Sequence, residues 1–236
     1  MLIAGFGEAQ TPRVPVLAEL FTSEGCNSCP PADRLLESLL QEQPVDEAYV
    51  VILSEHVTYW DHQGWKDPFA SVQFTDRQKG YAFRFNLDSI YTPQLVIDGT
   101  RELVGSNKRS IERAVRDAAR TPKPLLHVEL GGLDAGLSVS ASGPGLVAGL
   151  DHELWFAVTE DNLVVEVKRG ENANRTLRHS GVVRRLQSAG SVDGDGIIKG
   201  TTFKLDPGWR RENLRVVAFV QSRQTRKILS VGSTKL

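Results

Sequence analysis

The pair Cys26 and Cys29 contains all the cysteine of this 236-residue chain, and its position constrains the fold more than any other feature. The pair follows an apolar run at 16–21 (VLAELF) that is typical of a strand. After Pro30, which the first turn of a helix tolerates, leucines recur at helical spacing. The apolar run at 48–53 (AYVVIL) is typical of a strand covered on both faces. The cysteines therefore open the helix of a β-α-β unit.

Further elements of the same kind are predicted up to residue 122. A second helix is indicated by four residues that can share one buried face: Phe74, Tyr81, Ala82 and Phe85. Two short β-runs at 90–97 and 101–104 flank Asp98-Gly99, which is a strong hairpin signal. A third amphipathic helix follows the hairpin. The predicted order over residues 1–122 is β-α-β-α-β-β-α.

Beyond residue 122 the pattern changes to short, alternating apolar runs separated by Gly, Asp, Asn and Ser. The runs are LLHVEL, LSVSA, ELWFAV, LVVEVK, GVVRRL, TFKL, LRVVAFV and ILSVG. Seven or eight strands at this spacing favour a β-sandwich over a barrel. The sequence thus predicts two domains: an α/β domain over residues 1–122 and an all-β, sandwich-like domain over residues 123–236.

Two cysteines cannot form the disulfide framework of a small secreted domain, but a pair two residues apart suits a redox centre or a metal site. At the beginning of a helix, free N–H groups and the positive end of the dipole stabilise a thiolate. We therefore expect Cys26 to attack and Cys29 to resolve the resulting mixed disulfide. Glu24 opposes thiolate formation because it carries a like charge.

A second mark of the same chemistry is Thr92-Pro93, at the start of the predicted hairpin. With the dithiol at a helix start in this order of elements, the first part of the chain resembles the thioredoxin superfamily. That resemblance implies a thioredoxin-like domain in which Pro93 is cis and faces the dithiol, and in which the backbone of Thr92 pairs with a substrate strand. From the residues alone, a proline that begins an edge strand is the alternative.

Four blocks narrow the resemblance further: LFTSEGCNSCPPAD, HVTYWDHQGWKDPF, YTPQLVIDG and GENANRTLRHSGVVR. They are similar to a bacterial family of secreted, thioredoxin-like proteins known as a domain of unknown function (DUF1223). The resemblance implies export, so we expect a periplasmic or secreted protein. The stretch MLIAGFGEAQ lacks the basic start and full apolar centre of a signal peptide, and a cytoplasmic location is therefore the alternative.

The loop after the second predicted strand is crowded with aromatic and polar residues: His56, Tyr59, Trp60, Asp61, His62 and Trp65. Aromatic side chains with a polar edge are favoured at binding sites. We predict a substrate surface formed by Trp60 and Trp65 from this loop, together with Tyr91, Thr92 and Pro93. Packing of a long loop onto the protein explains the same aromatic residues, and the pattern favours this alternative slightly.

We therefore predict a thiol-disulfide oxidoreductase whose substrate is a protein thiol or disulfide and which depends on an external redox partner. One rival is a copper or zinc binding or delivery protein that uses Cys26 and Cys29 with His56 and His62, although their spacing is not a finger pattern. The other rival is a binding module with an inert disulfide.

Other classes of partner find no support in the sequence. A formal net charge of −1 gives no general attraction to nucleic acid, and no apolar run approaches the roughly 20 residues that cross a bilayer. No cofactor is predicted, because the chain has no phosphate-binding glycine loop, zinc-protease signature or nucleophile elbow. His127, His152 and His179 have no neighbour in sequence that suggests a catalytic triad.

Overall fold

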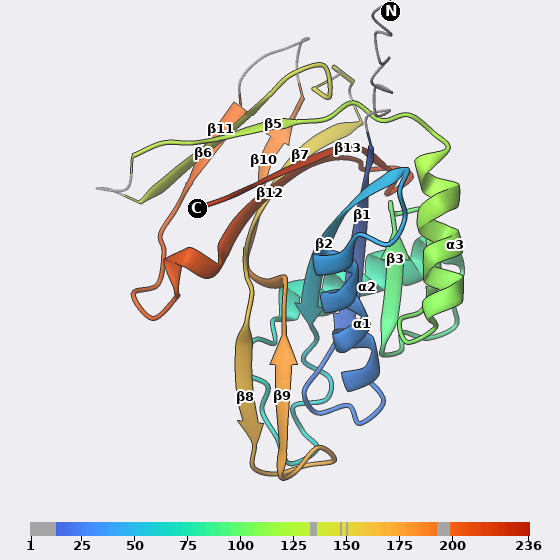
Figure 1. Ribbon diagram of the computed structural model, residues 1–236, viewed down its shortest axis with the longest axis vertical. Helices are drawn as coiled ribbons and strands as arrows, with labels where there is room; N and C mark the ends of the chain where they lie inside the picture. Colours follow the sequence, from blue (N-terminus) through green and yellow to red (C-terminus); the bar gives the residue numbers. More distant parts are fainter. Residues whose placement is uncertain (1–12, 133–135, 147, 150, 193–198) are drawn as a thin grey trace, which may run out of the picture.

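One mixed sheet of eight strands dominates the molecule (Figure 1). The computed structural model describes residues 13–132, 136–146, 148–149, 151–192 and 199–236. The strands of this sheet are, in spatial order, β13 (Ile228–Lys235), β12 (Leu214–Ser222), β7 (His152–Glu160), β10 (Val182–Ser191), β2 (Ala48–His56), β1 (Val14–Thr22), β3 (Gln94–Ile97) and β4 (Arg101–Val104). Strands from both halves of the chain therefore share one sheet.

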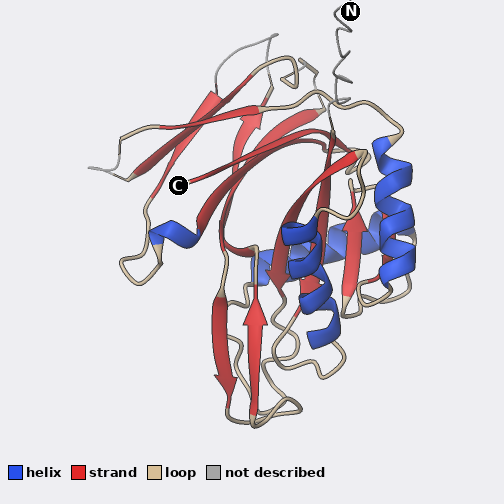
Figure 2. Ribbon diagram, in the orientation of Figure 1, coloured by secondary structure: helices blue, strands red, loops and turns tan. Residues whose placement is uncertain are grey.

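Three helices cover the half of this sheet that contains β1 and β2 (Figure 2). The helices are α1 (Pro30–Glu42), α2 (Val72–Phe85) and α3 (Lys108–Ala119). Ala18 and Leu20 of β1 pack with α1 and α3, whereas Phe21 of the same strand packs on the other face against Tyr81 of α2. Because both faces are covered, β1 and β2 are buried along almost their whole length.

The pairing of these strands places the ends of β1 and β2 at one edge of the sheet. β1 and β2 are parallel over nine residue pairs, from Val14 with Ala48 to Thr22 with His56. β3 is antiparallel to β1, and β4 is antiparallel to β3. The segments that follow β1 and β2 therefore leave the sheet side by side. One is the cysteine loop, residues 23–29, and the other is the aromatic loop, residues 57–71.

The helices and strands predicted up to residue 122 are confirmed, each within a few residues at its ends. The predicted hairpin joins β3 to β4 at Asp98 and Gly99, whose φ angles are 48° and 65°. Positive φ at both central residues, with the Thr100 amide donating a 3.0 Å hydrogen bond to the Ile97 carbonyl, is the geometry of a type I′ turn. None of the helices in the described residues is long and apolar enough to span a membrane.

The sheet does not end at the predicted boundary between domains. Val182 of β10 pairs with Ser54 of β2, and the Ser54 amide donates a 2.7 Å hydrogen bond to the carbonyl of Gly181. A cluster of buried side chains crosses the same boundary, since Leu17 and Val51 pack in one core with Val217 of β12. The division at residue 122 remains a prediction, while the two parts it separates share both a sheet and a core.

A second layer covers the other half of the sheet. It is a three-stranded sheet of β11 (Lys199–Phe203), β6 (Leu137–Ser142) and β5 (His127–Leu130). Leu137 and Val139 from this layer pack in one core with Phe156 of β7 and Val216 of β12. A short 3-10 turn, η1 (Arg211–Asn213), precedes β12. A β-sandwich of its own for this half remains an expectation.

A two-stranded hairpin, β8 (Leu163–Val167) and β9 (Arg175–His179), lies apart from both sheets and beside α1 (Figure 1). The sequence predicted seven or eight strands in this half, and the described residues hold nine, β5 to β13. The strand that was missed is β9, because its sequence RTLRH has a single aliphatic residue and shows no apolar alternation. Leu177 and His179 are nevertheless buried on its inner face.

Candidate functional site

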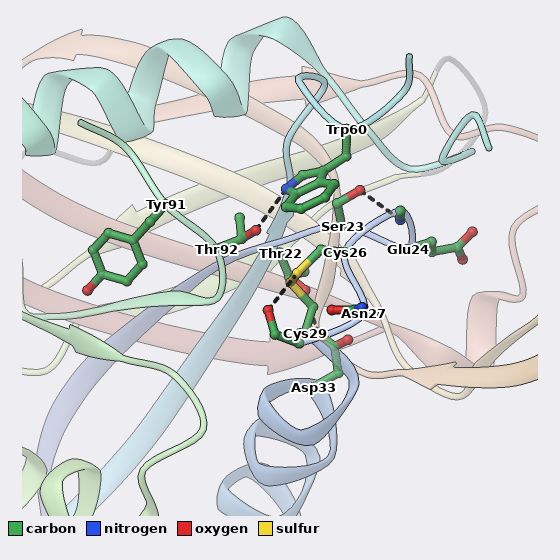
Figure 3. Close-up of a disulfide and its surroundings, with 12 residues drawn as sticks. Thr22, Ser23, Glu24, Cys26, Asn27, Cys29, Asp33, Trp60, Tyr91 and Thr92 are labelled. Atoms are coloured by element: carbon green, nitrogen blue, oxygen red, sulfur yellow. Dashed lines mark hydrogen bonds between the residues drawn. A yellow bond between two sulfur atoms is a disulfide. The ribbon is translucent and has the colours of Figure 1, made fainter. Parts of the chain in front are cut away.

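Cys26 and Cys29 form a disulfide at the beginning of α1 (Figure 3). Cys29 is the N-cap residue, and its carbonyl accepts hydrogen bonds from the amides of Ala32 and Asp33. The helix starts here because Pro30 has no amide hydrogen to satisfy and its fixed φ suits a first turn. Both cysteines are fully buried, with an exposed fraction of 0 %, and Cys26 Sγ lies 3.2 Å from the hydroxyl of Ser28.

The loop that precedes β3, residues 86–93, lies beside the disulfide (Figure 3). The peptide bond between Thr92 and Pro93 is cis, as the thioredoxin resemblance implied. Trp60 Nε1 donates a 2.8 Å hydrogen bond to Thr92 Oγ1, and Figure 3 shows both side chains on the same side of the disulfide. A Cβ atom at Gly25 would lie 2.9 Å from Trp60 Cβ, so the close approach of the aromatic loop requires a glycine at position 25. Trp60 and Thr92, both predicted to contact substrate, thus contact each other.

The turn between β8 and β9, residues 168–174, makes hydrogen bonds with the cysteine loop. Asn172 is fully buried and donates two hydrogen bonds, to the carbonyl of Glu24 at 2.8 Å and to that of Cys26 at 2.9 Å. The Asn27 amide donates to Glu171 Oε2 at 3.1 Å. The second half of the chain therefore fixes the backbone conformation around Cys26.

Behind the cysteine loop lies a cluster of buried ionisable side chains: Glu24, Asp33, His56, Asp67 and His179. Asp67 Oδ2 is 2.7 Å from His56 Nδ1 and accepts a hydrogen bond from the Glu24 amide at 2.8 Å. His179 Nε2 lies 3.3 Å from Glu24 Oε1, and His179 Nδ1 lies 3.8 Å from Asp33 Oδ2. The two imidazole rings face each other edge to face, with centroids 5.0 Å apart. The cluster joins residues of five different segments.

Burial and mutual attraction shift the pKa values in this cluster in opposite directions. Burial raises the pKa of Asp33, and the nearby imidazoles and the Thr22 hydroxyl, which donates to Asp33 at 2.8 Å, offset only part of that rise. Burial alone would lower the pKa of His56 and raise that of Asp67, but their attraction outweighs it in both groups. The His56 pKa is therefore raised and the Asp67 pKa lowered, as in a buried ion pair.

The Glu24 side chain is directed away from the cysteines and into the buried cluster. Its carboxylate accepts a 2.7 Å hydrogen bond from Trp65 Nε1 and faces His179. Figure 3 shows the side chain pointing away from the two sulfur atoms. The opposition of this carboxylate to a thiolate at Cys26 stays a prediction. Trp65, predicted to contact substrate, has its indole N–H engaged by Glu24.

The proposed set of metal ligands is not assembled. Cys26 and Cys29 are bonded to each other, His56 is paired with Asp67, and His62 is exposed. Across the part of the chain that the structure describes, no group of three or more His, Cys, Asp and Glu side chains is arranged to hold a metal ion.

Four residues of the site are given no role by the sequence analysis: Asp33, Asp67, Asn172 and His179. Asn172 and His179 lie farthest away in sequence. Each reaches the cysteine loop across about 150 positions, so no local spacing connects them with it. The only signal was the block GENANRTLRHSGVVR, which contains both residues and was noted for its resemblance to a family.

Tyr91 lies in the same loop as Thr92 and Pro93, but Figure 3 shows its side chain directed away from the disulfide, and its hydroxyl donates a hydrogen bond to Glu102. The contact of Tyr91, Thr92 and Pro93 with a substrate stays a prediction.

The fold and the site define a mixed α/β protein with a Cys-x-x-Cys disulfide at the start of a helix. The model of the family described as "Protein of unknown function (DUF1223)" matches residues 17–221, and the chain belongs to this family. No curated protein matches the chain.

Two solved structures resemble the whole chain. The X-ray crystal structure of a protein from Agrobacterium tumefaciens is 26% identical, with a TM-score of 0.72, and the match covers 96% of this chain and 95% of that one. HBP35 of Porphyromonas gingivalis is 18% identical, with a TM-score of 0.64 over 97% of this chain and 77% of that one. The second likeness is one of fold alone.

Proposed function

We propose that this protein is a thiol-disulfide oxidoreductase that exchanges electrons with protein thiols or disulfides through Cys26 and Cys29. The observation that carries the proposal is the disulfide itself, formed at the start of α1 beside the cis bond of Thr92-Pro93. The order β1-α1-β2-α2-β3-β4-α3, with strands in the order β2-β1-β3-β4, supports a thioredoxin-like domain. The partners would be a protein substrate and an external redox partner, in the periplasm or outside the cell.

The exchange is a pair of thiolate displacements. A thiolate of the partner attacks Cys26 Sγ, the bond between Cys26 and Cys29 breaks, and the electron pair leaves on the Cys29 sulfur, which takes up a proton. A second partner thiolate then attacks the mixed disulfide, which releases the Cys26 thiolate and an oxidised partner. The reverse sequence, which begins with attack by Cys26, reduces a substrate disulfide and restores the Cys26–Cys29 bond.

Groups around the disulfide can stabilise the thiolate and exchange the proton that these steps involve. The positive end of α1 stabilises a thiolate at Cys26. Asp33 stands in the first turn of α1, is buried, and has a raised pKa because of that burial. A buried carboxyl group with a raised pKa is a candidate for general acid-base work, and its place in the first turn after Cys29 suits Asp33 to exchange a proton with the Cys29 thiol.

Substitution of each cysteine tests the assigned roles. We expect Cys29→Ala to accumulate mixed disulfides with partner proteins, because Cys26 can still attack but nothing resolves the product. Cys26→Ala should trap far less, and a variant with both substitutions serves as the control. Non-reducing electrophoresis followed by mass spectrometry measures the adducts, and equal trapping by the two single variants would contradict the assignment.

The burial of Cys26 favours one second candidate, a binding module with an inert structural disulfide. An exposed attacking sulfur is usual for exchange proteins, and here its exposed fraction is 0 % in the disulfide form. Under the leading proposal the groups that cover Cys26 must move aside before a partner reaches its sulfur. The reduction potential of the pair separates the two functions.

A further inference from the structure

Asn172 is held in one orientation between the two halves of the chain. Its Nδ2 atom uses both hydrogens, one toward the Glu24 carbonyl and one toward the Cys26 carbonyl. Its Oδ1 atom accepts a 2.9 Å hydrogen bond from Arg175 Nη1. Because a guanidinium only donates hydrogen bonds, Arg175 fixes which end of the amide faces the cysteine loop.

The turn that carries Asn172 is itself fixed against the aromatic loop. Gly170 has a φ of +77°, and a Cβ atom at this position would lie 3.1 Å from the carbonyl oxygen of Gln63 and 3.2 Å from Trp65 Cβ. Across the turn, the Asn174 amide donates to the Val167 carbonyl at 2.9 Å. Asn172 is therefore presented to the cysteine loop by a turn that packs against the aromatic loop and is closed by its own backbone hydrogen bond.

We infer that Asn172 is a positioning residue that shifts the equilibrium of the Cys26–Cys29 pair toward the disulfide. The Cys26 carbonyl is held by Asn172 on one side, and it also accepts a 3.2 Å hydrogen bond from the Cys29 amide. These two contacts keep the segment between the cysteines in the closed conformation that the disulfide needs. The inference rests on the proposed function, since it concerns how readily that same pair is reduced.

The direction of the effect follows from conformational entropy. In the disulfide form the covalent bond already restricts the loop, so the loss of Asn172 frees little motion. In the dithiol form nothing else links the two cysteine side chains, so the loss of Asn172 frees much more. Without Asn172 the dithiol gains entropy relative to the disulfide, and the reduction by two glutathione molecules to the dithiol and one glutathione disulfide becomes more favourable.

The test compares three forms of the full chain in glutathione redox buffers, with free thiols quantified at equilibrium: the native chain, Asn172→Ala and Thr176→Ala. Thr176 lies on β9 of the same hairpin and is exposed, so its substitution is the matched control. We expect Asn172→Ala to raise the equilibrium constant for reduction about tenfold, which is about 30 mV for a two-electron couple. Thr176→Ala should leave it unchanged.

A second variant covers the case in which Asn172→Ala fails to fold. Arg175 is exposed, and Arg175→Ala removes only the contact that orients the amide, so we expect a smaller shift in the same direction. An equilibrium constant for Asn172→Ala within twofold of the native value would overturn the inference and leave the proposed function intact. If Asn172→Ala does not fold, an equilibrium constant for Arg175→Ala that is unchanged or lowered would do the same. A native pair that glutathione does not reduce at all would instead overturn the proposed function, and the inference with it.

Discussion

At the scale of single residues, the cost of burying charge explains how the polar cluster behind the disulfide is arranged. An isolated buried charge is expensive, so such groups are found paired or neutralised. His56 and Asp67 meet this requirement as an ion pair at 2.7 Å whose side chains are both fully buried. Asp33 meets this requirement differently, because burial raises its pKa and so favours the neutral carboxyl group. The same site thus holds one ion pair and one carboxyl group whose neutral form is favoured by burial.

The pairing predicts a stability effect with a defined dependence on pH. The raised pKa of His56 contributes stability that is fully present below about 6.5 and is lost as pH rises through its folded pKa. The lowered pKa of Asp67 contributes stability above about 3.8 that is lost as pH falls through its folded pKa. The ion pair therefore stabilises the fold most between about pH 4 and 6.5.

Asp67→Asn removes this charge while it keeps an oxygen for the Glu24 amide. We expect the free energy of unfolding to fall by about 3 kcal/mol near pH 5, and by less near pH 8.5, because the contribution of the ion pair decreases as pH rises through the raised pKa of His56. Urea unfolding at both pH values measures the loss, with Asp76→Asn at the exposed pair with Lys79 as the control. A loss that grows with rising pH would show that the pair is not ionised in the folded state.

The cysteines of the site could be predicted from the sequence, and the residues that hold them could not. Cys26 and Cys29 were found from their spacing at a strand-helix junction, and the cis bond before Pro93 followed from resemblance. Asn172 and His179 reach the same loop only because β9 lies beside α1. A contact made across about 150 residues depends on tertiary packing, which periodicity and spacing do not record.

At the scale of elements, the turn between β3 and β4 fits tightly against the turn between β12 and β13. Gly99 has a φ of +65°, and a Cβ atom there would lie 1.8 Å from the carbonyl oxygen of Arg226. Beside it, the Ile228 amide donates to the Asp98 carbonyl at 2.9 Å. Glycine is needed at this position both for its backbone conformation and for the close approach of a second chain segment.

Gly99→Ala should therefore destabilise the protein more than an ordinary glycine substitution. We expect a loss of at least about 2 kcal/mol, seen as a lowered Tm in thermal unfolding, because the added methyl group must displace a backbone carbonyl. Gly132→Ala is the matched control, since a Cβ atom at Gly132 would have no neighbour within 4 Å. Equal Tm values for the two variants would show that the two turns are not in contact in solution.

Most elements could be predicted because their burial leaves a simple pattern. β1 and β2 have both faces covered and read as apolar runs, and α1 has one buried face and reads as leucines at helical spacing. β9 was missed because only Leu177 and His179 face inward, in a strand that is otherwise exposed. A strand is recognised from sequence by its apolar face, and β9 has almost none.

At the scale of the whole molecule, one sheet and one shared core connect the parts that the sequence separated. The change of sequence pattern at residue 122 matches a change in secondary structure, because α3 ends at Ala119 and the elements that follow in the described residues are strands and one 3-10 turn. The pairing of β10 with β2 could not be predicted, because it depends on which strand edge each part leaves open. Buried residues of β1, β2, β10 and β12 then pack together across the junction.

This continuity predicts that the chain unfolds in one cooperative transition. Trp60 and Trp65 report on the first part, and Trp155 and Trp209 report on the second. In variants that keep only one of these pairs, with phenylalanine at the other two positions, we expect coincident midpoints of urea unfolding followed by tryptophan fluorescence. Two midpoints separated by a plateau would show that the parts are independently stable domains.

The reduction potential of the Cys26–Cys29 pair tests the proposed function most directly. The protein is equilibrated with glutathione buffers of known ratio, and its free thiols are quantified. We expect a value between roughly −120 and −270 mV, the range of proteins that exchange disulfides, and its position in that range would indicate the direction of electron flow. A value below about −300 mV would identify an inert structural bridge and contradict the proposed function.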